Sequence, residues 1–129
     1  MEPISIAATE RTPEVQFDFA QGSLLLSGES YPEDAAAFFG PLHEAIAGHV
    51  AASPDRPLNF ELALSYFNSS SAKALMNMFM LLEDAAEAGA SVTIRWRYAA
   101  DDDTIEEAGE DFAADFQHAR FELVAEARR

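Results

Sequence analysis

The sequence predicts an α/β fold: one domain over residues 1–129, with a mixed β-sheet and packed helices. Two observations support this fold class. Short stretches in which every second side chain is apolar, typical of strands, alternate with longer runs whose apolar residues recur every three or four positions, typical of helices. The resulting order is β-β-α-β-α-β-α-β. Its strand–helix–strand units favour parallel strands, whereas the first two strands favour a hairpin.

The predicted hairpin comes first. Residues 14–20 alternate apolar and polar side chains, Gln21-Gly22 is a turn signal, and residues 23–27 form the second strand. Residues 4–7 could add a short strand before them.

A helix is expected after the hairpin. Ser30 and Glu33 have the spacing of a capping box, and Pro32 suits a first helical turn. We therefore expect a helix from this signal to about Ala51. Its apolar face would consist of Phe38, Leu42, Ile46 and Val50.

The second half of the chain repeats the strand and helix pattern. A proline-containing loop at residues 53–57 precedes a strand at 58–65, and a long helical run over 72–88 ends at Gly89, a typical C-terminal cap. The remaining expected elements are a strand at 91–98, an acidic helix from Asp101 to about Phe116, an edge strand at 120–124 and a frayed tail at 125–129.

Composition and charge argue against several functions. The net charge is −15, from 23 acidic and 8 basic residues. Such a surface repels phosphate backbones and anionic lipid, so nucleic-acid and membrane partners are not expected. The chain has no cysteine, which excludes disulfides and thiolate zinc sites. It shows neither a long apolar span nor the pattern of a secretory signal, and we expect a cytoplasmic protein.

No motif indicates an enzyme or a bound cofactor. The histidines are His43, His49 and His118, and no serine lies in a nucleophile elbow. Neither a Walker loop nor a glycine-rich dinucleotide turn is present. The acidic run beginning at Asp101 is not a calcium loop, because Glu106 stands where an EF-hand needs glycine. Acidic residues there instead suit a helix start.

Three consecutive hydroxyls mark the start of the long helix. Tyr66 to Lys73 reads Tyr-Phe-Asn-Ser-Ser-Ser-Ala-Lys, at the junction between a strand and this helix. A helix N-terminus offers unpaired N–H groups and a positive dipole end, which suit a phosphate. Ser69 or Ser70 could instead be simply the N-cap, and the side chain of Asn68 could also cap the helix. Lys73, the only lysine, could help hold a phosphate or could be a solvated side chain.

The long helix also carries more apolar residues than one packing face needs. Leu75, Phe79, Leu82 and Ala86 form one stripe, and Met78, Leu81 and Ala85 form a second one beside it. If Met78 and Leu81 are exposed, they offer a docking surface near the hydroxyls, since methionine is common on adaptable binding surfaces. The alternative is a helix buried more deeply than usual.

Several sequence blocks together resemble the SiaC-type regulatory phosphoproteins, small acidic bacterial proteins. The most specific blocks are Ser-Tyr-Pro-Glu within residues 28–33 and Tyr-Phe-Asn-x-Ser-Ser within residues 66–73. Thr-Pro-Glu-Val at residues 12–15, Trp-Arg-Tyr at 96–98 and Glu-Ala-Gly-Glu-Asp-Phe at 107–112 complete the pattern. The resemblance covers nearly the whole chain.

This resemblance implies a fold similar to the STAS-type anti-sigma-factor antagonists and a role in partner switching, without enzymatic activity. A Ser/Thr protein kinase of the SiaB type would phosphorylate a hydroxyl at the start of the long helix, and a PP2C-like phosphatase would remove the phosphate. In the best-known system the unphosphorylated form binds and activates a GGDEF diguanylate cyclase, which raises cyclic-di-GMP and promotes biofilm formation.

By the motif, the modified hydroxyl maps to Ser69, directly after Asn68, where the family pattern has threonine. Serine keeps the hydroxyl, and Ser70 or Ser71 could substitute for it. The expected partner-binding residues are Tyr66, Asn68, Ser70, Ser71, Lys73, Met78 and Leu81. An anti-sigma-factor antagonist acting on transcription and a small anion-binding domain are the alternative functions.

Overall fold

Strands and helices follow the alternation of the sequence. A computed structural model describes residues 2–127. Its elements are β1 (Ile4–Ile6), β2 (Glu14–Asp18), β3 (Ser23–Ser30), α1 (Ala35–Ala52), β4 (Leu58–Phe67), α2 (Ser69–Glu87), β5 (Val92–Ala99), α3 (Asp103–Ala113) and β6 (Arg120–Glu126). The predicted α/β fold and its element order are confirmed, and β1 is the short strand suggested at residues 4–7.

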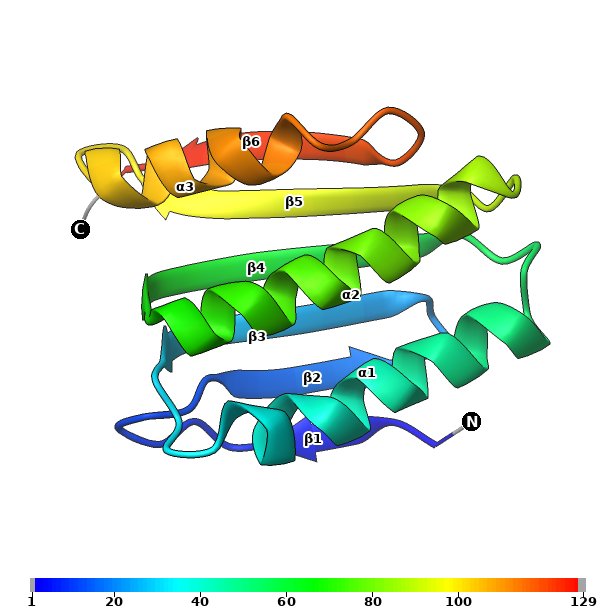
Figure 1. Cartoon of the computed structure of the whole chain (residues 1–129), viewed down its shortest axis with the longest axis horizontal. Coiled ribbons are helices and arrows are strands. Elements are labelled where there is room, and N and C mark those ends of the chain that lie inside the picture. The colour runs from blue at the N-terminus through cyan, green and yellow to red at the C-terminus, as the bar shows by residue number, and fades with distance from the viewer. Residues whose placement is uncertain (1, 128–129) are drawn as a thin grey trace.

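The six strands form one mixed sheet in chain order. The pairs β1–β2 and β2–β3 are antiparallel, whereas β3, β4, β5 and β6 run parallel to one another. Each crossover moves one strand along the sheet in the same direction, so right-handed connections place α1, α2 and α3 on the same face. Figure 1 shows the three helices side by side on that face, each beginning at the edge where the parallel strands end.

The core lies between the sheet and the helices. Phe17, Leu26, Phe60 and Trp96 are at most 1% exposed, and they come from the strand positions that face the helices. The opposite face of the sheet is polar. There, cross-strand ion pairs join Arg95 and Arg97 of β5 to Glu61, Glu122 and Glu126 on the neighbouring strands.

The capping box predicted at Ser30 is wrong. The N-cap of α1 is Asp34, whose carboxylate accepts a hydrogen bond from the backbone N–H of Ala37 at 3.0 Å. Ser30 is instead the last residue of β3 and is fully buried. It remains in the strand because β4 extends to Phe67, which pairs with Ser30 in the sheet. Pairing with the neighbouring strand therefore overrides the local helix signal.

Other element boundaries also differ from the predicted ones. The helix α2 begins at Ser69 rather than residue 72, and α3 ends at Ala113 rather than Phe116. The buried stripe of α1 contains Phe39 and His49, whereas the expected Phe38 and Val50 flank it and are half-buried. The strand β6 covers part of the expected frayed tail, of which residues 128–129 lie outside the described residues. No helix within residues 2–127 combines the length and apolar character that crossing a membrane requires.

Candidate functional site

The start of α2 is capped by Asn68. Its side-chain oxygen accepts a hydrogen bond from the backbone N–H of Ser71 at 2.9 Å. Ser69, Ser70 and Ser71 are therefore the first three residues of the helix. The alternative of a cap at Asn68 is confirmed, and the N-cap interpretation of Ser69 or Ser70 is wrong. Asparagine is as good a cap as serine, so a short run of suitable residues does not by itself identify which one caps.

The three hydroxyls lie in different environments. Ser69 and Ser70 are exposed, whereas Ser71 is fully buried. The Ser71 hydroxyl donates a hydrogen bond to the Ser30 carbonyl at 3.0 Å, and its Oγ lies 2.7 Å from that of Ser30. The same carbonyl accepts the backbone N–H of Asn68 at 3.0 Å. Ser71 thus fastens the helix to the end of β3, and its hydroxyl does not face solvent.

An aromatic pair stands beside these hydroxyls. Tyr31 and Tyr66 pack edge to face with ring centroids 5.8 Å apart, and Tyr66 is 50% exposed. Tyr66 lies near the end of β4, where it pairs with Glu29 of β3. The carboxyl ends of the adjacent parallel strands β3 and β4 therefore bring Tyr66 close to the first turn of α2, residues 69–71, which we call the hydroxyl-bearing turn. Ligands of open α/β sheets commonly bind at this edge.

Lys73 gives this end of α2 a local positive charge. It lies one helical turn after Ser69, it is exposed, and it makes no ion pair within the described chain. The first turn of α2 contains no acidic residue, so the positive end of the helix dipole is not neutralised there. The start of α2 is therefore locally positive, although the chain as a whole has a net charge of −15.

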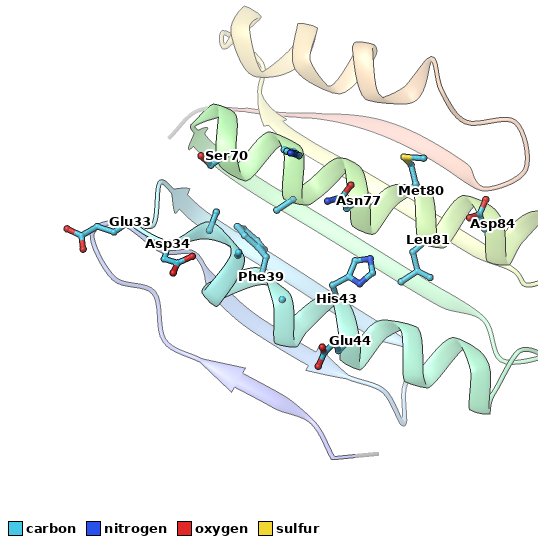
Figure 2. A pocket seen from close by; sticks show the side chains of 15 residues that line it. Glu33, Asp34, Phe39, His43, Glu44, Ser70, Asn77, Met80, Leu81 and Asp84 are labelled. Atoms are coloured by element: carbon cyan, nitrogen blue, oxygen red, sulfur yellow. The ribbon is translucent and has the colours of Figure 1, made fainter.

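A groove of about 950 Å³ runs between α1 and α2 and reaches Ser70 and Lys73 at one end. Phe39 of α1 reaches toward α2, and further along the groove His43 and Leu81 face one another from the two helices (Figure 2). The hydroxyl-bearing turn is therefore continuous with an elongated depression on the helical face of the molecule.

The structure decides between the two alternatives for Met78, an exposed docking surface and a deeply buried helix. Met78 is fully buried, so the deeply buried helix is confirmed for this residue. Leu81 is half-buried and lines the groove. The exposed methionine is Met80, at 57%, which lies between the groove and a second hollow of about 290 Å³ beside α3. The sequence signal for Met80 is that it lies outside both predicted stripes and four positions after Met76, so the two methionines share one side of the helix.

The Glu83 carboxylate, further along α2, binds the backbone of the residues that precede β6. Glu83 accepts the backbone N–H groups of Gln117, His118 and Ala119 at distances between 2.8 and 3.1 Å. Burial alone would raise the pKa of Glu83, but these hydrogen bonds, together with one to the His118 ring, outweigh it and lower the pKa to about 2. Glu83 is a structural residue. Within residues 2–127, no group of three or more histidine, aspartate or glutamate side chains is arranged to hold a metal ion.

Comparisons with known proteins agree with this geometry. The family model for SiaC family regulatory phosphoproteins matches residues 6–126. An uncharacterised protein of Pseudomonas aeruginosa is 36% identical over 115 residues, which cover 89% of this chain and 90% of that protein.

Solved structures from the same organism share the fold. The structure of SiaC of Pseudomonas aeruginosa has a TM-score of 0.91 at 35% identity, covering 98% of this chain and 100% of that one. A further match is a crystal structure of the diguanylate cyclase SiaD in complex with its activator SiaC, also from Pseudomonas aeruginosa. Its matched chain has a TM-score of 0.91 at 35% identity and covers 95% of this chain and 99% of that one.

Proposed function

The chain belongs to the SiaC family of regulatory phosphoproteins, and from this membership we propose that it is a non-enzymatic phospho-switch controlling a GGDEF diguanylate cyclase. In its unphosphorylated form it binds and activates the cyclase. A Ser/Thr kinase of the SiaB type phosphorylates it, and a PP2C-like phosphatase restores the binding form, in the cytoplasm. The solved complex of SiaD with its activator SiaC supports the choice of a cyclase as the partner.

The phosphate acceptor in this proposal is Ser69. The observation that carries the assignment is the contrast among the three hydroxyls: Ser69 is exposed at the first helical position, whereas Ser71 is buried and already hydrogen-bonded. Ser70 is exposed but lines the groove. A kinase can phosphorylate only a hydroxyl that it can reach. Ser69 is exposed, and it also stands at the position that the family motif gives for the modified residue.

Phosphorylation at this place should preserve the fold. A phosphate adds about −1.5 to −2 charge and three acceptor oxygens at neutral pH. At the start of α2 the free N–H groups and the helix dipole favour that charge. A partner packed over Ser69 would instead have to bury a dianion, which is costly unless a cation pairs with it. The modification can therefore disrupt one interface without unfolding the domain.

Mass spectrometry tests the assignment directly. The protein is incubated with its native kinase and ATP, and the intact mass and the fragment containing residues 66–73 are measured before and after the phosphatase is added. We expect a single phosphate on Ser69 that the phosphatase removes. A phosphate on Ser70 would overturn the assignment to Ser69, and a phosphate elsewhere, or none, would contradict the proposed switch.

A further inference from the structure

The strand β6 forms one border of the sheet, and β1 forms the other (Figure 1). β6 pairs with β5 on one side, and no strand lies on its other side within residues 2–127. We call this unpaired side of Arg120–Glu126 the β6 edge. Such an edge offers a row of N–H and C=O groups to another strand, so proteins commonly block it with proline, a bulge or a very short strand.

The two borders of the sheet differ in this protection. β1 has only three residues, Ile4–Ile6, and it directly follows Pro3. β6 has seven residues, contains neither proline nor glycine, and keeps a continuous register with β5. It also carries Val124, an apolar side chain that is 36% exposed. The β6 edge is therefore long and regular enough to accept another strand.

One hydrogen bond determines which backbone groups face the β6 edge. The Glu126 carbonyl accepts the backbone N–H of Ala100, which follows β5, at 2.8 Å, so the backbone of Glu126 points toward β5. Successive residues of a strand direct their N–H and C=O groups to opposite sides. The backbone groups of Phe121, Leu123 and Ala125 therefore point away from β5. No loop or helix within residues 2–127 forms a backbone hydrogen bond with them.

The side chains of β6 are self-complementary in an antiparallel pair. If Leu123 of one copy lies opposite Leu123 of a second, Arg120 of each copy lies opposite Glu126 of the other. Arg120 is exposed and forms no ion pair within residues 2–127. Glu126 is paired with Arg97, but a carboxylate can accept hydrogen bonds from two cations. These opposite positions are non-hydrogen-bonded ones, where the Cα atoms approach to about 4.5 Å and the side chains are closest.

Neighbouring registers of the same pair place like charges opposite one another. A pair centred on Val124 sets Glu122 against Glu126, and a pair centred on Glu122 sets two copies of that glutamate against each other. Like charges directly opposite each other destabilise a strand pair. Among these three registers, the one centred on Leu123 is therefore favoured.

We propose that the β6 edge is a self-association surface, at which two copies of this chain pair their β6 strands antiparallel. The two-fold axis passes beside Leu123, perpendicular to the sheet, so both copies use the same residues. The outward backbone groups form about six hydrogen bonds, two for each residue pair. Two Arg120–Glu126 ion pairs accompany them. Because this contact is small, the dimer is weak and depends on protein concentration.

The β6 edge is separate from the hydroxyl-bearing turn. Ser69 follows β4, and β5 lies between β4 and β6 in the sheet. Pairing at the β6 edge therefore leaves Ser69 exposed. The inference goes beyond the proposed function and does not depend on it.

Analytical ultracentrifugation of the full chain tests the association. Concentrations from about 5 µM to about 1 mM cover the range expected for a small interface. The salt concentration is about 0.15 M, which screens the net charge of −15 on each copy. We expect a reversible monomer–dimer equilibrium. A chain that remains monomeric over the whole range overturns the proposal.

Two charge reversals test the register. Arg120→Glu places glutamate opposite Glu126, and Glu126→Arg places arginine opposite Arg120, so each variant alone should dimerise at least about tenfold more weakly than the wild type. In an equimolar mixture of the two, both positions again carry opposite charges, and we expect a heterodimer within about threefold of the wild-type affinity. Thermal unfolding checks the folding of each variant, since Glu126→Arg also removes the ion pair with Arg97. Two folded variants that fail to associate in the mixture overturn the register.

A control and a backbone variant complete the test. Arg11→Glu makes the same charge change away from the β6 edge, in an exposed ion pair of little energetic weight, and should dimerise within about twofold of the wild type. Ala125→Pro removes an N–H that faces the β6 edge and leaves the hydrogen bonds to β5 in place, so it should remain folded and lose the dimer. Wild-type dimerisation of Ala125→Pro would mean that the copies associate through another surface, which overturns the proposal.

Discussion

Ser30 and Ser71 are 41 residues apart in the sequence, yet their hydroxyl oxygens lie 2.7 Å apart in the core. Ser30 ends β3, and Ser71 belongs to the first turn of α2. Their contact fixes the helix start, with its exposed Ser69, relative to the carboxyl edge of the sheet. Ser71, an alternate to Ser69 as the phosphorylated residue, is thus part of the buried scaffold, whereas Ser69, two positions earlier, is exposed.

Removing either hydroxyl should destabilise the protein. In Ser30→Ala or Ser71→Ala the remaining hydroxyl loses its buried hydroxyl partner, and a cost of about 1–3 kcal/mol is expected in the free energy of unfolding. The double variant should cost less than the sum of the single ones, because the two groups are coupled. Urea denaturation measures all three. Ser70→Ala is the control, since that side chain is exposed and should change stability by less than about 0.5 kcal/mol. Strict additivity would show that the two hydroxyls do not interact.

The sequence predicted the element order well because apolar periodicity is a local property. It failed at Ser30, where a capping pattern competed with strand pairing to Phe67 that no local pattern reveals. It left open whether Met78 is exposed or deeply buried, because the depth at which a helix sits on a sheet depends on the residues opposite it, and the structure shows this side chain fully buried. The motif located the hydroxyl turn correctly. Only the fold distinguishes exposed Ser69 from buried Ser71.

The groove was beyond prediction for a similar reason. Its two walls come from helices separated by a strand and a loop, and its openness depends on small residues such as Gly40 and Ala74. Small residues in a helical pattern predict neither a groove nor its position, because the same residues also permit close helix packing. Lys73 stands out in the sequence as the only lysine, but its place at the groove entrance follows from the packing of α1 against α2.

Glu83 should make stability depend on pH in the acidic range. Its pKa falls from 4.5 to about 2 in the folded protein, so its contribution is fully present above pH 4.5 and is lost as the pH falls toward 2. Glu83→Gln should cost about 2 kcal/mol at pH 7 and should flatten this dependence. Unfolding is followed in urea between pH 2.5 and 7. Glu87→Gln, an exposed change at the end of the same helix, should leave the profile unchanged. An identical profile for both variants would refute the role of Glu83.

Gly109 of α3 should tolerate no side chain. A Cβ atom there would lie 2.4 Å from Cδ1 of Trp96, whose indole N–H donates to the Ile105 carbonyl at 2.9 Å. Because the indole is held by this bond and is fully buried, Gly109→Ala should cost about 1–3 kcal/mol in the free energy of unfolding. The same change at Gly48, an exposed position of α1 that no proline follows, should instead stabilise the helix by about 0.5–1 kcal/mol. Thermal unfolding compares the two variants, and a neutral Gly109→Ala would mean that α3 can shift away from the sheet.

Substitutions at Ser69 should separate binding from folding. Ser69→Ala keeps the start of α2 uncharged, so it should bind the cyclase with wild-type affinity and resist release by the kinase. Ser69→Asp introduces a negative charge one turn from Lys73, and we expect it to weaken binding at least tenfold while leaving the melting temperature within a few degrees of the wild type, because an acid at a helix start is favourable. The control is Thr104→Asp, an exposed hydroxyl-to-carboxylate change in the first turn of α3, which should bind normally. Calorimetry against the cyclase measures the affinities. Equal affinity of Ser69→Ala and Ser69→Asp would show that charge at this position does not control the partner, since both variants have the same groove and the same cap at Asn68.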